Sequence, residues 1–330
     1  MRTRQSIKNI AVASLVAVVG LSVAFVGQSY AQQEATSSTA NTLKVSPLRT
    51  DVTADPGETK TVKIIVTNPS NAEVSVKPIQ NDFVADDKED GSPAIILDEN
   101  EYSKSNSLKR FLVPLESFNL AGGETKVVEA TINVPSNAEA GGYFGAIRFA
   151  PTAPDAGGQV NMSPSVASII LLRVNGQVSE KLELTDFQVL QDSKATNYLL
   201  SDQSVSMLVR FKNNSKVQLA PFGSISVQKG DKVVYNANFN NSEQKDMVLP
   251  ASARRWEVPL KYIDGFGKYT VSATFTYGSA NQTLEATQVF WVIPLPIIIG
   301  SAIGLVVVIG LIVLLIVRSK RQKGSIKLGK

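Results

Sequence analysis

Between residues 42 and 290 the chain is a succession of short segments in which apolar and polar residues alternate. Gly, Pro, Asn, Asp and Ser separate these segments. A period of two residues is typical of β-strands, because successive side chains point to opposite faces of a sheet. The segment 269–277, for example, alternates Tyr, Val, Ala, Phe and Tyr with hydroxyl residues. No segment of this region shows a helical period, so the pattern predicts antiparallel β-sandwiches.

Two stretches of this region are nearly the same: "PGETKTVKIIVTNPSNAEV" begins at Pro56 and "GGETKVVEATINVPSNAEA" begins at Gly122. In each, Pro-Gly or Gly-Gly indicates a turn, the middle alternates, and Pro-Ser-Asn ends the strand. A tandem repeat would need more copies and a longer matched span. We therefore expect two similar strands of one sandwich, and neither interpretation implies an active site.

The N-terminal residues have the layout of a secretory signal. Arg2, Arg4 and Lys8 precede an apolar run, and Ser29-Tyr30-Ala31 offers small residues for cleavage. This order predicts a signal peptide over 1–31, cleaved after Ala31. An uncleaved anchor helix is the alternative.

Near the C-terminus, the 21 residues from 297 to 317 carry no charge. As a helix they would extend about 31 Å, which matches the hydrocarbon thickness of a bilayer. We therefore predict one transmembrane helix over 294–317 and a basic cytoplasmic tail over 318–330. The membrane-interface anchors we expect are Phe290, Trp291, Arg318, Lys320 and Arg321.

This arrangement predicts a single-pass protein of the cell membrane, with its N-terminal domains extracytoplasmic and the lipid bilayer as a partner. Three of the 33 Lys and Arg residues lie in the signal and six in the tail, which leaves 24 basic residues against all 29 acidic ones between them. The extracytoplasmic part is therefore acidic, which argues against a nucleic-acid partner. An L-P-x-T-G motif, which a sortase substrate would need, is missing before the helix.

The chain contains no Cys and no His. It therefore has no disulfide, no thiol nucleophile, and neither the commonest general base nor the commonest transition-metal ligand. We predict that the protein is not an enzyme and uses no cofactor, metal or small-molecule substrate.

Three motifs have both a functional and a structural interpretation. "ADDKEDGSP" at 85–93 is acidic like a calcium loop, but its spacing favours a solvated hairpin tip. Ser226 and Lys229 match S-x-x-K without the partner motifs of penicillin-interacting enzymes. "GGYFGAIRF" at 141–149 lacks the following helix of a phosphate loop, so its glycines indicate a bulge or a close backbone approach.

The loop 150–164, "APTAPDAGGQVNMSP", is the best candidate for an exposed binding loop, because long loops in compact domains are often functional. The residues that we expect it to present are Pro151, Asp155, Gln159 and Asn161.

The predicted fold is all-β, with two immunoglobulin-like antiparallel β-sandwich domains over 42–176 and 177–290 and one C-terminal transmembrane helix. The boundary near Gly176 follows "SVASIILLRVNG". The G-x-Y-x-V pattern around Tyr269 resembles the strand of immunoglobulin-like domains in which Tyr precedes a Cys by two residues. Val271 occupies the Cys position, and Trp256 is the candidate core Trp.

The whole layout resembles the WxL-interacting protein family of bacterial cell surfaces, with local matches at "VSPLRTDVTADPGETKTVKIIVTNPSN" and "GGYFGAIRF". The resemblance implies two immunoglobulin-like domains, the first associated with peptidoglycan and the second with host ligands. The opening strands also resemble those of pilus chaperones, which lack the anchor. The leading hypothesis is a non-catalytic surface protein that binds a cell-wall polymer or another surface protein through sandwich edges and loops. The alternative is an assembly chaperone or structural subunit of an envelope or pilus-like complex.

Overall fold

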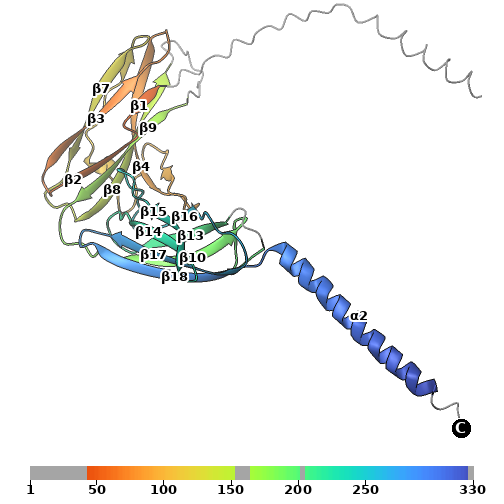
Figure 1. Cartoon of the computed structure of the whole chain (residues 1–330). Coiled ribbons are helices and arrows are strands. Elements are labelled where there is room, and N and C mark those ends of the chain that lie inside the picture. The colour runs from red at the N-terminus through yellow and green to blue at the C-terminus, as the bar shows by residue number, and fades with distance from the viewer. Residues whose placement is uncertain (1–42, 153–163, 201–204, 326–330) are drawn as a thin grey trace, which may run out of the picture. The chain divides into compact units, whose positions relative to one another are not determined.

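The computed structural model describes residues 43–152, 164–200 and 205–325 (Figure 1). The described residues before the C-terminal helix form two β-sandwiches, each made of two sheets. The prediction of an all-β fold with two immunoglobulin-like sandwiches and one apolar C-terminal helix is confirmed. The predicted signal peptide, 1–31, lies outside the described residues.

The first sandwich contains a sheet of order β1-β3-β7 and a sheet of order β2-β9-β8-β4-β5, with β6 also paired to β4. Their bounds are β1 Lys44–Ser46, β2 Arg49–Ala54, β3 Thr59–Thr67, β4 Val74–Ala85, β5 Pro93–Ile95, β6 Phe118–Leu120, β7 Thr125–Asn133, β8 Gly141–Thr152 and β9 Val166–Val174. A short 3-10 helix, η1, covers Lys109–Phe111. The alternating residues Val62, Ile64 and Val66 of β3 are buried in the core of this sandwich.

The second sandwich contains a sheet of order β11-β10-β13-β16 and a sheet of order β12-β18-β17-β14-β15. Their bounds are β10 Leu182–Gln191, β11 Lys194–Ala195, β12 Tyr198–Leu199, β13 Val205–Asn213, β14 Phe222–Lys229, β15 Lys232–Phe239, β16 Ala253–Pro259, β17 Gly267–Tyr277 and β18 Gln282–Val292. The apolar face of β17 is buried as its alternation predicts, with Tyr269, Val271 and Phe275 fully enclosed.

Among the described strands two pairs are parallel, β2 with β9 and β12 with β18, whereas the alternation predicted antiparallel sheets throughout. The period of a strand says which side chains are buried, but it carries no information on the direction of the neighbouring strand. Trp256 is half-buried and packs edge-on against Phe211 and Phe239 at the side of the second core. The hydroxyl of Tyr269 donates to the carbonyl of Asp264, as a Tyr at this place does in immunoglobulin-like domains.

The two near-identical stretches form β3 and β7, which are antiparallel neighbours in one sheet. Antiparallel pairing brings the turn that begins each strand against the segment that ends the other. Gly57 N–H donates to the carbonyls of Val134 and Pro135, and Gly123 N–H donates to those of Asn68 and Ser70. The sequence is duplicated because the same contact, which we call the closure, occurs at each end of the strand pair: a glycine turn at the start of one strand donates to the segment that ends the other.

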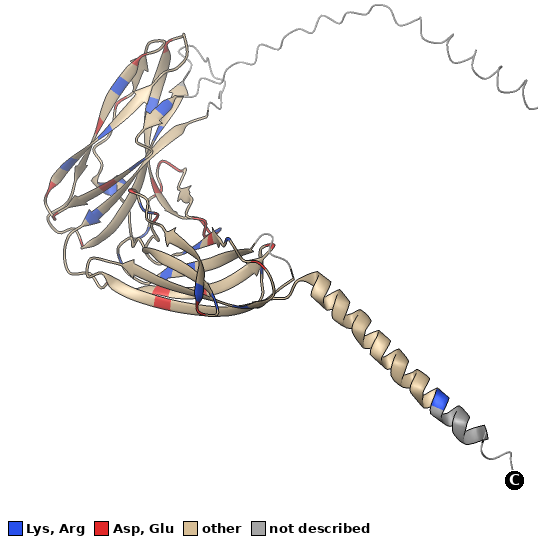
Figure 2. Cartoon of the chain, in the orientation of Figure 1, with Lys and Arg blue, Asp and Glu red and all other residues tan. Residues whose placement is uncertain are grey.

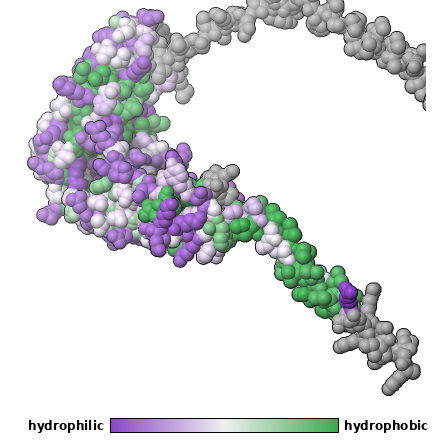
Figure 3. Space-filling model, in the orientation of Figure 1, coloured by the Kyte–Doolittle hydropathy of each residue, from purple (hydrophilic) through white to green (hydrophobic). Residues whose placement is uncertain are grey.

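The C-terminal helix α2, Leu295–Ser325, follows β18 after two residues. Its part Leu295–Arg318, 24 residues, is long and apolar enough to cross a membrane. The surface of this part is apolar on the face that Figure 3 presents, and no charged side chain interrupts it before Arg318 (Figures 2 and 3).

Candidate functional site

The predicted binding loop is only partly described. Pro151 is not a loop residue, because it lies in β8, is buried, and pairs with Val76 of β4. The strand β8 continues to Thr152 and so absorbs the beginning of the expected loop. Asp155, Gln159 and Asn161 lie outside the described residues.

The predicted membrane-interface anchors separate into two groups. Phe290 is fully buried and stacks on Tyr269 in the second core at 5.3 Å, so its ring is a core element and is not available to lipid. Trp291, the next residue of β18, points to the other face and is 39% exposed. Arg318, Lys320 and Arg321 lie in α2, where Arg318 is exposed.

The acidic loop between β4 and β5 contacts the second sandwich and is more than a solvated tip. The carboxylate of Glu89 accepts two hydrogen bonds from the Arg210 guanidinium, both at 2.6 Å, and the Glu89 carbonyl accepts one from Arg255 N–H. The hydrogen bond from Arg210 lowers the pKa of Glu89, and the same bond raises the pKa of Arg210. This bidentate pair connects the two sandwiches, and both of its side chains are partly exposed to solvent.

A glycine in the same loop allows a second arginine to approach. A Cβ added at Gly91 would lie within 2.1 Å of the Arg254 guanidinium carbon. Arg254 also lies over the ring of Trp256 and forms an ion pair with Asp246 at 3.0 Å. A side chain here would displace the end of Arg254, and Gly91 also has φ of 88°, a backbone conformation that favours glycine.

The glycine pair that opens β8 also serves close approach between the sandwiches. Gly142 N–H donates to the carbonyl of Lys216 at 2.8 Å, and a Cβ at Gly141 would lie 3.1 Å from that oxygen. The expectation of close backbone approach at "GGYFGAIRF" is therefore confirmed. These glycines hold a protein segment of the second sandwich.

A small apolar cluster completes the junction. Phe83, Phe144, Ala146 and Leu171 of the first sandwich are buried beneath Met247 and Leu249 of the second, with Ile95 and Ile169 at the margin. Arg173 and Glu180 form an ion pair at 2.6 Å nearby. Burial raises the pKa of Glu180, but the bonds from Arg173 and Ser279 outweigh it, and the net shift is downward.

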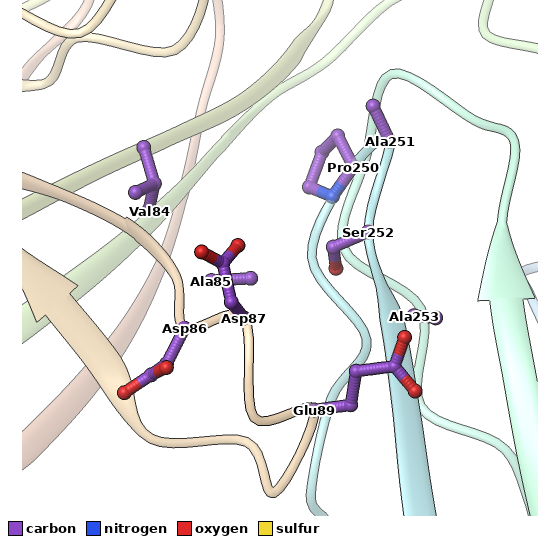
Figure 4. Close-up of a pocket in the computed structure, with 9 residues that line it drawn as sticks. All are labelled: Val84, Ala85, Asp86, Asp87, Glu89, Pro250, Ala251, Ser252 and Ala253. Atoms are coloured by element: carbon purple, nitrogen blue, oxygen red, sulfur yellow. The ribbon is translucent and has the colours of Figure 1, made fainter.

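Three surface hollows lie along this junction. The hollow drawn in Figure 4, of about 290 Å³, has residues 84–87 and Glu89 on one side and Pro250 to Ala253 on the other, and the Glu89 side chain reaches across it. Two more hollows share Glu139, Ala140, Ser215 and Lys216 in their lining. In the parts of the chain that the structure describes, no group of three His, Cys, Asp or Glu side chains is arranged to hold a metal ion.

A second candidate surface is the outer edge of β7. Val134 exchanges backbone hydrogen bonds with Gly57 and Glu58, so the backbone N–H and C=O groups of the even-numbered residues of β7 point toward β3. The Thr131 carbonyl accepts from Val113 N–H on the opposite side, so the backbone N–H and C=O groups of the odd-numbered residues point away from β3. Between 125 and 129 the described residues provide no strand on that outer side, and Val127 is 52% exposed there.

Sequence reasoning did not identify Arg210, Arg254 or the free edge of β7 as notable. Both arginines lie at polar positions of strands in which apolar and polar residues alternate, which predicts only that their side chains point away from the core. Their contacts in the first sandwich, Glu89 for Arg210 and Gly91 for Arg254, lie more than a hundred residues away in the chain, and no local pattern carries that information.

No family model and no curated protein matches the chain. Among solved structures, it is similar to a chaperone–tip adhesin complex of CFA/I fimbriae, at 11% identity over 75% of this chain and 98% of the other, with a TM-score of 0.38. It is also similar to the class 5 fimbriae chaperone CfaA, at 12% identity over 75% and 98%, with a TM-score of 0.37. The E. coli chaperone DraB is similar at 15% identity over 76% and 96%, with a TM-score of 0.33.

Proposed function

We propose that the chain is a membrane-anchored, non-catalytic binding protein of the bacterial cell surface, of the WxL-interacting type. The helix α2 is its single anchor, the two sandwiches are extracytoplasmic, and the tail 318–330 is cytoplasmic. The contacts between the sandwiches are structural: a bidentate ion pair, backbone hydrogen bonds and an apolar cluster hold protein segments together there.

The free outer edge of β7 is the observation that carries this proposal. Unpaired backbone donors and acceptors along a strand are a template for a further strand, and proteins recognise extended segments in this way. The edge presents Val127, with Lys126 and Glu129 exposed beside it. A backbone template favours a polypeptide over a glycan, so the partner is another surface protein, and a cell-wall polymer is the competing outcome.

An assembly chaperone or structural subunit is the second candidate. The similar solved structures include chaperones described with an adhesin or a pilin. At these TM-scores the likeness does not distinguish a chaperone from a surface receptor. The two roles differ in the lifetime and stoichiometry of the complex.

The test is affinity capture from envelope extract with the full chain in detergent, together with sedimentation on purified wall polymer. Val127→Pro removes an outward N–H and leaves the bonds to β3 in place, whereas Val127→Ala keeps the N–H. We expect the Pro variant to lose the captured protein and the Ala variant to retain it. Equal capture by both variants would exclude the β7 edge. Binding to wall polymer without any captured protein would replace the proposed protein partner by a cell-wall polymer. A stoichiometric complex with another envelope protein that is released upon assembly would favour the assembly chaperone.

A further inference from the structure

The linker between the second sandwich and α2 is very short. β18 ends at Val292 and α2 begins at Leu295. The N–H of Ile293 still donates to the Leu199 carbonyl at 2.8 Å, and the carbonyl of Pro294 accepts a hydrogen bond from Ile297 N–H of α2 at 2.9 Å. Three steps between Cα atoms cover at most about 11 Å, so the apolar helix starts within that distance of the sandwich.

The length of the apolar helix limits how far the sandwich can stand from a bilayer. Leu295–Arg318 contains 24 residues, which extend about 36 Å as a helix, against a hydrocarbon core of about 30 Å. Little more than one helical turn can therefore project beyond the core. If α2 spans the bilayer, the end of β18 lies at the level of the lipid headgroups.

This end of the sandwich exposes aromatic and apolar side chains that come from separate segments. The register pairs Tyr198 with Trp291 and Gly267 with Val292, and the Phe266 ring lies 6.4 Å from the Trp291 ring. We call the group the juxtamembrane face, and it consists of Tyr198, Leu200, Tyr262, Phe266 and Trp291. These side chains are between 39% and 73% exposed.

The loop that carries Tyr262 is built to hold this ring outward. Tyr262 adopts a left-handed backbone conformation, with φ of 60°, which is unfavourable for a bulky side chain. The next residue, Ile263, is buried at 4% exposure, and Lys229 Nζ donates to the Asp264 carbonyl at 2.9 Å. The Tyr262 ring lies 6.2 Å from the Tyr235 ring and is still the most exposed of these rings, and the backbone strain that holds it there points to a surface that covers it.

The charges around the rings are mixed. Lys261 precedes Tyr262 in the chain, Lys268 pairs with Trp291 across the strands, and Asp264 lies between the two lysines in sequence; all three charged residues are exposed. Tyr and Trp rings prefer the membrane–water interface, because they combine an apolar body with a polar tip. Lysine ammonium groups at the same level can meet lipid phosphates. The opposite end of the sandwich is occupied by contacts with the first sandwich, such as Gly142 with Lys216.

We propose that the juxtamembrane face docks into the headgroup region of the bilayer that α2 crosses, so that the second sandwich stands on the membrane. This inference rests on the proposed membrane anchoring. It adds a second, peripheral contact made by loops that are far from the helix in sequence. The contact would fix the orientation of the second sandwich relative to the membrane.

The test uses the full chain in vesicles of phosphatidylcholine and phosphatidylglycerol. Because the chain has no Cys, Lys261→Cys and Glu243→Cys each give a unique position for an environment-sensitive fluorophore. Glu243 is exposed in the loop after β15, at the opposite end of the sandwich. Nitroxide lipids labelled at the headgroup should quench the probe at 261 severalfold more than the probe at 243. Adding Tyr262→Ser and Phe266→Ser to Lys261→Cys should abolish that difference.

The outcomes separate this inference from the proposed anchoring. Flotation of the chain with the vesicles, with the probe at 261 unquenched, would leave the anchor intact and overturn the docking. Equal quenching at 243 and 261 would also overturn it, because the sandwich would then lie on its side. Failure of the chain to float with the vesicles would remove the anchor and the docking together.

Discussion

At the scale of single residues, Glu89 shows how a surface carboxylate becomes a structural contact. Its carboxylate binds Arg210 with two bonds in a fixed geometry, and its carbonyl binds Arg255 at the same time. An isolated surface ion pair contributes little, but bidentate geometry with a backbone bond beside it contributes more. The contact between the sandwiches therefore includes Glu89, although the acidic composition of its loop, 85–93, predicts a loop exposed to solvent.

The pH dependence of this contact follows from the lowered pKa of Glu89. A carboxylate whose pKa is lower in the folded state stabilises the fold above its unfolded pKa, and this stability is lost as pH falls through the folded pKa. We expect Glu89→Gln to lower the unfolding free energy by on the order of 1 kcal/mol at neutral pH, and the difference from wild type to shrink as pH falls below the ordinary pKa of a Glu carboxyl and to vanish below the folded pKa.

Thermal unfolding of the wild type and Glu89→Gln between about pH 3 and 8 measures this, with Glu243→Gln as an exposed control. Because the chain has no His and no Cys, the wild-type midpoint should change little between about pH 6 and 8. A Glu89→Gln deficit that persists at the acid end would contradict the role of the carboxylate charge.

At the scale of elements, β3 and β7 form a pair whose two ends are chemically equivalent. Glu58 accepts from Asp55 N–H at one end, and Glu124 accepts from Ala121 N–H at the other. Gly57 and Gly123 begin the two closures with φ of 84° and 76°. Both glycines are required by the left-handed backbone and not by lack of space, since an added Cβ would meet nothing closer than 3.7 Å at Gly57 and nothing within 4 Å at Gly123.

This equivalence predicts matched effects of substitution. Gly57→Ala and Gly123→Ala should each destabilise the protein by about 1–2 kcal/mol, because each places a Cβ on a left-handed residue. The two sites lie a strand length apart, so the double variant should show the sum within about 0.5 kcal/mol. Chemical denaturation of the single and double variants measures this. Strongly unequal single effects would show that the two closures are not equivalent.

At the scale of the whole molecule, the two sandwiches are coupled by a small apolar cluster, polar clamps and backbone contacts. Met247 and Leu249 belong to the second sandwich but complete a cluster of the first. Each sandwich has its own core, but such shared burial couples their unfolding, because separating them exposes this cluster to water.

We expect the wild type to unfold the two sandwiches in one transition and Leu249→Ser to separate them into two. The serine leaves the hydrophobic contact of the junction incomplete and adds a polar group to it. Calorimetry of both proteins tests this, with Val233→Ser, an exposed position on β15, as the matched control. Two transitions in the wild type would show that the junction does not couple the sandwiches.

Local patterns in the sequence were enough to predict the strands and the apolar helix. Alternation identified the buried faces of β3 and β17, and the charge-free run identified α2, because both signals depend only on neighbouring residues. Alternation also implied that Phe290 and Trp291 face opposite sides. It did not show which of them enters the core, and the prediction that both are membrane-interface anchors was wrong for Phe290.

Only the tertiary structure decided which strands pair and which distant side chains come into contact. The pairing of β3 with β7, the parallel strands β2 and β12, and the bond between Glu89 and Arg210 join segments that are distant in the chain. The gathering of Tyr198, Phe266 and Trp291 at one end of a sandwich has the same origin. Periodicity and composition are set by nearest neighbours, whereas strand order and register are set by the packing of whole sheets, and so the surfaces on which function depends appear only when the chain is folded.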